Sequence, residues 1–189
     1  MKRIAILSSV LAMGVLTALA LGHFLAPKPA QTRIVRAQWK NIYRTTAGLV
    51  AGADLIVTAN HMYAEPGRSV GEGDGATPFT NNGFAINSIL KGENDGPTFV
   101  LEQTGGIMGN GAVLNIDDGG AYEPGATYLL FLKSTGEGSY YLINHQARYR
   151  VTDGVLEGVD PTDEVVARMH GSSLDRSVNV IEKRVRMLE

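Results

Sequence analysis

The chain has 189 residues, a net charge of −2 and no cysteine. Without cysteine there can be no disulfide scaffold, cysteine-ligated zinc, iron–sulfur cluster or thiol nucleophile. Hydrophobic residues make up 44% and charged residues 19%, which is typical of a globular protein. The near-neutral charge offers no basic footprint for nucleic acid. Glycine, at 23 residues, is well above its usual share of ~7% and indicates many tight turns.

Residues 1–26 have the pattern of an export segment. Lys2 and Arg3 precede an uncharged run that extends to Pro27. This order keeps the N-terminus in the cytoplasm and sends the following chain across the membrane. The run reaches the ~20 residues needed to span a bilayer as a hydrophobic helix. A retained membrane anchor and a signal peptide cleaved at the small-x-small triplet 18–20 both fit, so we expect an extracytoplasmic protein, either anchored or secreted.

Residues 27–43 are predicted to be a linker that begins with a short proline-containing spacer. Three of the 17 basic residues and none of the 19 acidic residues lie within residues 1–30, so the remainder has a net charge of −5. An acidic exported domain is a poor candidate for binding nucleic acid or anionic lipid headgroups. A cysteine-free exported chain fits a bacterial cell envelope.

The folded part begins with a predicted short helix over residues 44–53. From residue 54 onward the apolar period changes to two, and glycine-rich turns separate short extended segments. Residues 71–83 are predicted to be a long loop or a wide hairpin connection, and Asp153-Gly154 predicts a tight hairpin. The predicted strands cover residues 54–65, 84–91, 98–103, 113–116, 128–132, 140–143, 146–151 and 155–156. Residues 128–132 are apolar on both faces, which predicts a central strand covered on both sides.

The C-terminal residues 161–189 are predicted to be helical. Asp160 is expected to cap a first helix that begins at Pro161 and ends at Gly171. Ser172 and Asp175 form a capping-box pair for a second helix. That helix carries an apolar stripe of Leu174, Val178, Ile181, Val185 and Leu188. We expect the stripe to pack on the β domain, with docking of a partner as the alternative.

Five segments in this order carry a resemblance to a known family: residues 54–57, 89–92, 103–106, 124–132 and 146–151. Together they resemble small exported bacterial proteins, mostly uncharacterised, that have an OB-like β-barrel similar to tissue inhibitors of metalloproteinases and netrin modules. The resemblance covers about residues 54–155. It implies a mainly β fold, with an OB-like barrel over residues 44–160, C-terminal helices packed on it and an N-terminal hydrophobic helix.

The chain departs from the family pattern in two places, with Ala147 where glycine is usual and Thr104 where proline is usual. The animal inhibitors act through an N-terminal cysteine that ligates the protease zinc. This chain has no cysteine. The resemblance therefore implies a fold and an extracytoplasmic setting, and it supplies no catalytic residues.

A candidate binding face lies on the predicted strand 146–151. Strict alternation there places Ala147, Tyr149 and Val151 inward and Gln146, Arg148 and Arg150 outward. With Tyr141, the outward residues are predicted to form a platform for carboxylates or sugar rings. The alternative is an ordinary solvated strand face, whose cations discourage edge pairing.

The remaining motifs are weak. His61 and His145 are the histidines that lie next to predicted strands, and they could meet at one rim of the barrel. Each is otherwise an ordinary strand-end residue, and no HExxH or Gly-x-Ser-x-Gly motif occurs. The acidic loops 71–75 and 117–120 lack EF-hand spacing. No catalytic residue, metal or cofactor is therefore predicted.

These observations predict a non-enzymatic binding module of the bacterial cell envelope. Its partner is expected to be an envelope protein or a glycan, its N-terminal segment is expected to contact the membrane, and no nucleic acid is expected. Two alternatives stay open. One is a protease inhibitor that acts through the glycine-rich loop 105–111, and the other is an envelope hydrolase.

Overall fold

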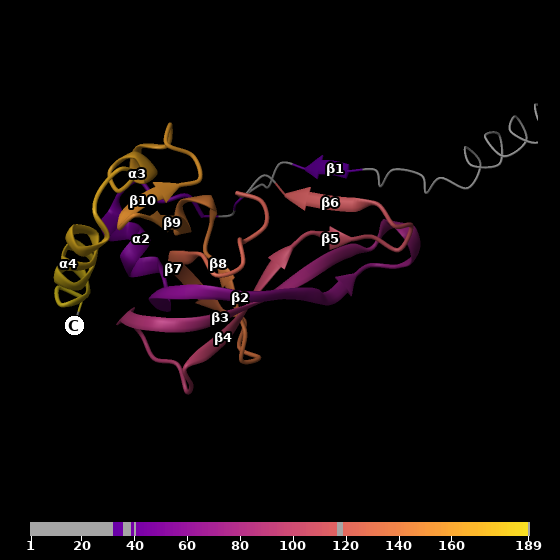
Figure 1. Ribbon diagram of the computed structural model, residues 1–189, viewed down its shortest axis with the longest axis horizontal. Helices are drawn as coiled ribbons and strands as arrows, with labels where there is room; N and C mark the ends of the chain where they lie inside the picture. Colours follow the sequence, from indigo (N-terminus) through magenta and orange to yellow (C-terminus); the bar gives the residue numbers. More distant parts are fainter. Residues whose placement is uncertain (1–31, 36–38, 40, 117–118, 189) are drawn as a thin grey trace, which may run out of the picture. The chain divides into compact units, whose positions relative to one another are not determined.

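The computed structural model describes residues 32–35, 39, 41–116 and 119–188, and this part of the chain is mainly β (Figure 1). It contains ten strands and three α-helices. The predicted export segment and its hydrophobic helix, residues 1–26, lie outside the described residues. Within the described ranges, no helix combines the length and hydropathy needed to cross a bilayer.

Five strands pair side by side in a partly closed ring. In order around the ring they are β7 (Thr127–Ser134), β2 (Leu55–Val70), β3 (Thr77–Lys91), β4 (Thr98–Thr104) and β8 (Tyr140–Leu142). The ring closes because β8 also pairs with β7. Neighbouring strands are antiparallel except β4 and β8, which meet as a short parallel pair at Leu101 and Tyr140. β9 (Arg148–Thr152) and β10 (Val155–Gly158) extend the sheet beyond β7.

The buried centre of the sheet is β7, as the sequence predicts. Residues 128–132 are all buried, and they lie opposite residues 55–59 of β2, which are buried as well. This double burial explains why both segments are apolar at consecutive positions. The tight hairpin is confirmed too, since Asp153 and Gly154 both adopt positive φ, at 51° and 77°.

The hairpin of β2 and β3 is much longer than predicted. β2 continues through Pro66 and Gly67 to Val70, and β3 already begins at Thr77. The predicted strand end at Pro66 is therefore wrong. Residues 71–83 do contain the connection of a hairpin, but it is shorter than predicted because residues 77–83 belong to β3. A register shift between Pro66 and Ser69 absorbs the proline, and Gly67 allows close packing on Asn81. This outer half is largely exposed, so it lacks the apolar alternation that signals a strand.

A smaller sheet has the order β1-β6-β5. β5 (Gly106–Ile107) and β6 (Val113–Ile116) fold part of the predicted glycine-rich loop into a short hairpin, and β1 (Thr32–Val35) pairs with β6 in parallel. The predicted linker 27–43 therefore contains a strand. Its side chains are mostly exposed, and Ile34 is 72% exposed, so backbone hydrogen bonding rather than burial forms this pairing.

Helix α2 (Thr46–Gly52) confirms the predicted helix, with Thr45 as its N-cap. Its glycines, which weaken a helix intrinsically, serve packing here: a Cβ at Gly52 would overlap the Tyr43 ring. At the C-terminal end of α2, Nζ of Lys91 donates to the carbonyl oxygens of Val50, Ala51 and Ala53. Lys91 thereby fixes α2 to the end of β3.

The C-terminal helices are α3 (Glu164–Ala167) and α4 (Leu174–Val185). Their caps differ from the prediction: Asp163 rather than Asp160 caps α3, and Ser173 rather than Ser172 caps α4. Helix α4 packs against α2 and β3. Four of the five predicted stripe residues contact the core, namely Leu174, Val178, Ile181 and Val185. Leu188 lies beyond the helix end and is 54% exposed.

Candidate functional site

The predicted binding face does not exist as an exposed surface. Residues 145–147 form a short 3-10 turn, and β9 begins only at Arg148, so the alternation that the sequence suggests is interrupted. Gln146 is fully buried and Arg148 is 5% exposed. Both were predicted to point outward, and that prediction is wrong because each side chain is turned into a polar network inside the fold.

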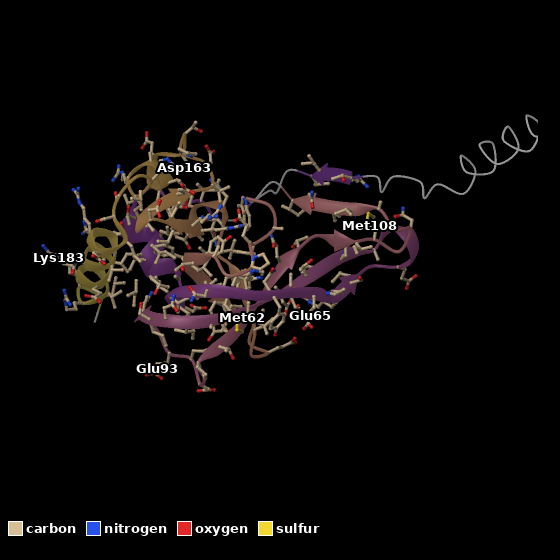
Figure 2. All side chains as sticks on the ribbon, in the orientation of Figure 1. Met62, Glu65, Glu93, Met108, Asp163 and Lys183 are labelled. Atoms are coloured by element: carbon tan, nitrogen blue, oxygen red, sulfur yellow. The ribbon has the colours of Figure 1, made fainter. Side chains whose placement is uncertain are left out.

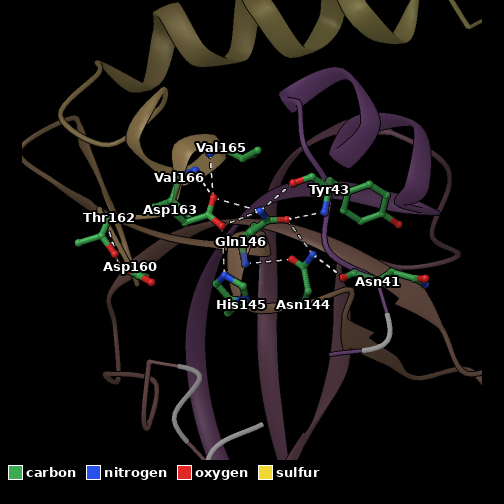
Figure 3. Close-up of polar contacts among 10 residues, drawn as sticks. All are labelled: Asn41, Tyr43, Asn144, His145, Gln146, Asp160, Thr162, Asp163, Val165 and Val166. Atoms are coloured by element: carbon green, nitrogen blue, oxygen red, sulfur yellow. Dashed lines mark hydrogen bonds and ion pairs between the residues drawn. The ribbon is translucent and has the colours of Figure 1, made fainter. Parts of the chain in front are cut away.

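Gln146 is the centre of one such network (Figure 3). Its Oε1 accepts from the backbone N–H of Tyr43 and from Nδ2 of Asn144, each at 2.9 Å. Its Nε2 donates to the carbonyl of Tyr43 at 3.0 Å and to both carboxylate oxygens of Asp163 at 2.9 and 3.0 Å. The amide is therefore saturated, and it joins the segment before α2 to the start of α3.

Asp163 completes this junction (Figures 2 and 3). Its carboxylate caps α3 by accepting from the backbone N–H groups of Val165 and Val166, and Nε2 of His145 lies 3.5 Å away. Burial alone would raise the pKa of Asp163. The hydrogen bonds from Val166, Gln146 and Val165, with the nearby His145, outweigh burial and hold that pKa below its usual value. These contacts are those of a structural junction.

Arg148 makes a second internal network. Its guanidinium lies over the Tyr122 ring, 3.8 Å from the centroid, and it donates to the carbonyls of Gly120 and Ala121 at 2.7 and 3.0 Å. Such a buried cation is stabilised by the ring face and by carbonyl acceptors. Arg148 and Arg150 do share a cleft of about 270 Å³, but Arg150 is paired there with Glu123 at 2.6 Å.

The other predicted residues lie apart from this cleft. Tyr141 is 43% exposed on β8, where its ladder partner is Lys133. His61 is 2% exposed and packs on the rings of Phe84 and Tyr122, while neither of its ring nitrogens has a hydrogen-bond partner. His145 lies beside Asp163 and the Trp39 ring. The two histidines thus occupy different environments, with no shared acid or nucleophile.

A different surface emerges where α2, α4 and the segment before α4 meet. Residues of all three line an open cavity of about 800 Å³. Three arginines stand in its wall: Arg168 before α4, and Arg176 and Arg184 on α4 itself. Among the described residues that line it there is no aspartate or glutamate. We call it the arginine cavity.

The three arginines of the cavity form no ion pair with the carboxylates that the structure describes. Across the described ranges, none of Arg168, Arg176 and Arg184 has a carboxylate within ion-pair distance. By contrast, Arg186, which is not a lining residue of the cavity, has Glu182 at 3.9 Å. The N–H groups of arginines that have no ion-pair partner can all donate hydrogen bonds to a ligand.

His170 adds a further donor to the cavity. Its Nδ1 accepts from the backbone N–H of Gly158 at 3.2 Å. A ring that accepts at Nδ1 carries its proton on Nε2, so Nε2 remains a donor. The titratable side chains of this cavity therefore present donors and no carboxylate acceptor.

One pattern in the sequence points to this site, although the overall composition does not show it. Arg176, Val180 and Arg184 follow one another at intervals of four, which places them along one side of the predicted helix. The contribution of Arg168 and of α2 depends on tertiary packing. In the described part of the chain, no cluster of histidine and acidic residues is arranged to hold a metal. Neither protein-family models nor curated proteins match this chain.

Proposed function

We propose that this chain is an exported, non-enzymatic binding module of the bacterial cell envelope, and that it binds an anionic ligand in the arginine cavity. The observation that carries the proposal is the set of Arg168, Arg176 and Arg184 around one open cavity, with no acidic residue in its described wall and no ion pair to any of the three within the described ranges. The size of the cavity, about 800 Å³, lies within the range of small-molecule sites, roughly 300–1,000 Å³.

Electrostatics supports this proposal. The chain beyond residue 30 has a net charge of −5, so its overall field repels anions. An anionic ligand would supply the opposite charge that the described wall of the cavity lacks. The same chain pairs Arg68, Arg150 and Lys133 with carboxylates. Acidic partners are therefore available in this sequence, and the described wall of the cavity has none.

The fold supports a binding role as well. We propose that the five-stranded ring is an OB-like barrel of the kind found in tissue inhibitors of metalloproteinases and netrin modules. Closure of β7 on β8 and the parallel contact of β4 with β8 agree with a five-stranded, partly open Greek-key barrel. Barrels of this kind serve mainly as recognition modules. In this proposal, the apolar residues 4–26 deliver the module across the membrane.

A binding assay tests the proposal. The full chain in non-ionic detergent would be titrated with three oligosaccharides of equal length that carry phosphate, carboxylate or no charge. We expect binding of at least one charged oligosaccharide and none of the neutral one. The variant R176Q/R184Q should lose at least tenfold in affinity. The control K183Q/R186Q removes two cations from the same helix outside the cavity, and it should remain within twofold of the parent.

Two results would refute the binding proposal. One is equal affinity for charged and neutral oligosaccharides. The other is an equal loss in both double variants, because bulk charge rather than the cavity would then explain the interaction. Lys183 is suited to the control because its side chain points away from the domain (Figure 2).

A protease inhibitor remains the second candidate, on one observation. Ile107 is 69% exposed in the hairpin of β5 and β6, where Met108 accepts from Gly111 and donates to Ala112 through backbone atoms. A rigid loop with an apolar tip is the type of element that inserts into a protease cleft. Inhibition of a panel of metalloproteases and serine proteases, compared with the variant Ile107→Ser, tests this candidate.

A further inference from the structure

We infer that the ligand of the arginine cavity is a phosphate ester carried on a sugar or another polyol. This inference rests on the proposed function and narrows it to one ligand chemistry. It follows from three properties of the described cavity wall: the type of hydrogen-bonding groups, the number of cations, and the small, polar or apolar side chains that make up the rest of it.

The hydrogen-bonding groups favour an acceptor-rich ligand. Three guanidinium groups each supply five N–H donors and no acceptor. The hydroxyl groups of Thr45 and Ser173 accept from backbone N–H groups at the starts of α2 and α4, so their own O–H protons remain available. His170 contributes Nε2–H, since its Nδ1 is engaged by Gly158. A phosphate group is surrounded by acceptor oxygens and matches such a wall.

The number of cations favours phosphate over a single carboxylate. A phosphate monoester carries a charge of about −1.5 to −2 at neutral pH and has three terminal oxygens. A carboxylate carries −1 and two oxygens, which one arginine can satisfy in a bidentate contact. Three unpaired arginines, supplied by α4 and by the segment before it, exceed what one carboxylate needs.

The rest of the wall indicates what carries the phosphate. A cavity of about 800 Å³ is far larger than an inorganic phosphate ion, so it has room for an organic group attached to the phosphate. Among the described lining residues there is no phenylalanine, tyrosine or tryptophan, so the flat groups available to stack on a nucleobase are the His170 ring and the guanidinium planes. The lining also includes serines, threonines and small apolar residues such as Ala47 and Val180. That combination suits a polyol, which presents hydroxyls and C–H groups together.

Isothermal titration of the full chain in non-ionic detergent tests the inference with defined probes: glucose 1-phosphate, glucuronate, inorganic phosphate, adenosine monophosphate and glucose. We expect glucose 1-phosphate to bind at least tenfold more tightly than glucuronate and inorganic phosphate, and glucose not to bind. R176Q/R184Q should weaken glucose 1-phosphate at least tenfold, and K183Q/R186Q by less than twofold. Far-UV circular dichroism confirms that both variants are folded.

The possible failures are distinguishable. If glucuronate equals glucose 1-phosphate and both depend on Arg176 and Arg184, the phosphate inference is overturned and the anion-binding proposal stands. If inorganic phosphate or the nucleotide binds as tightly as glucose 1-phosphate, the polyol part is overturned. If both double variants lose affinity equally, or if none of the charged probes binds, the inference and the proposed function are both refuted.

A competition experiment distinguishes two carriers of the phosphate ester, a soluble polyol and a lipid. Glycerol 3-phosphate and lysophosphatidic acid carry the same phosphate monoester, one on a soluble polyol and one on a lipid. The inference predicts that glycerol 3-phosphate competes with glucose 1-phosphate for the cavity. Competition by lysophosphatidic acid in mixed micelles, with none by glycerol 3-phosphate, would overturn the assignment to a soluble polyol.

Discussion

Replacement of Gln146 by leucine tests whether the buried amide network holds the start of α2 to α3. The substitution removes the acceptor for the Tyr43 N–H and the donor for the Tyr43 carbonyl. Asn144 and Asp163 also lose a contact, but each retains other partners. Each of the two Tyr43 backbone groups that loses its partner costs ~1–3 kcal/mol. After subtraction of the gain from a more apolar side chain, we expect the free energy of unfolding to fall by about 3 kcal/mol.

The assay is urea unfolding of the full chain, followed by fluorescence of the single tryptophan, Trp39, whose ring lies 6.4 Å from that of His145. With an m-value of ~1–3 kcal/mol/M, the expected loss moves the midpoint by at least about 1 M. The matched control is Tyr141→Leu, another residue of the predicted face. It is exposed on β8 and should change stability by less than ~0.5 kcal/mol.

A charge variant at the same position sharpens the test. Gln146→Glu keeps an acceptor for Tyr43 but faces the Asp163 carboxylate with a second carboxylate. It should be destabilised at neutral pH and recover partly as the pH falls, because protonation restores a donor. The reasoning is refuted if Gln146→Leu costs less than ~1 kcal/mol, or if Gln146→Glu is as stable as the parent at pH 7.

Four further expectations can be measured on the same chain. Because the pKa of Asp163 is lowered in the folded state, its contribution is present above the unfolded value of ~3.9 and is lost as the pH falls below it. Asp163→Asn should therefore flatten the fall of the urea midpoint between pH 5 and pH 3, and an unchanged slope would contradict this. His61→Leu should raise the free energy of unfolding by ~1 kcal/mol, since it removes two unpaired buried nitrogens; a lower melting temperature would contradict that account. Gly52→Ala should destabilise by ~1–3 kcal/mol despite a better helix propensity, because its Cβ overlaps the Tyr43 ring; pairing it with Tyr43→Ala should remove the penalty. Deletion of residues 2–26 should retain the chain in the cytosol, as cell fractionation would show, and the intact mass of the exported chain distinguishes an anchor from a cleaved signal.

Much of the fold follows from short-range patterns in the sequence. The strand over residues 128–132 is apolar at every position, the Asp153-Gly154 pair needs positive φ, and the stripe on α4 repeats every three or four residues. Each of these signals depends on a few adjacent residues, so the sequence alone is sufficient to read them. The long hairpin was missed because its outer half is exposed, and an exposed strand has no apolar alternation.

The predicted site failed for a related reason. Alternation along residues 146–151 predicts which side chains share a face, but it does not predict whether that face is covered. Gln146 is covered because its partner Tyr43 lies 103 positions earlier in the chain, and Arg148 is covered because the loop carrying Gly120 and Ala121 folds over it. Long-range partners of this kind leave no local pattern.

The β-rich class, the central strand, the tight turns and the amphipathic helix can be read from short segments of the sequence, since these arise from periodicity and backbone conformation within a few residues. Which polar side chains are buried, and which cations line an open cavity, depends instead on how distant segments pack together. The arginine cavity is lined by residues 45–47, by residues 167–173 and by residues of α4. The first of these segments is far from the others in the sequence, so no spacing within one segment predicts that they meet. Burial and charge neutralisation are properties of packed neighbours, and packing brings together residues that the sequence keeps far apart.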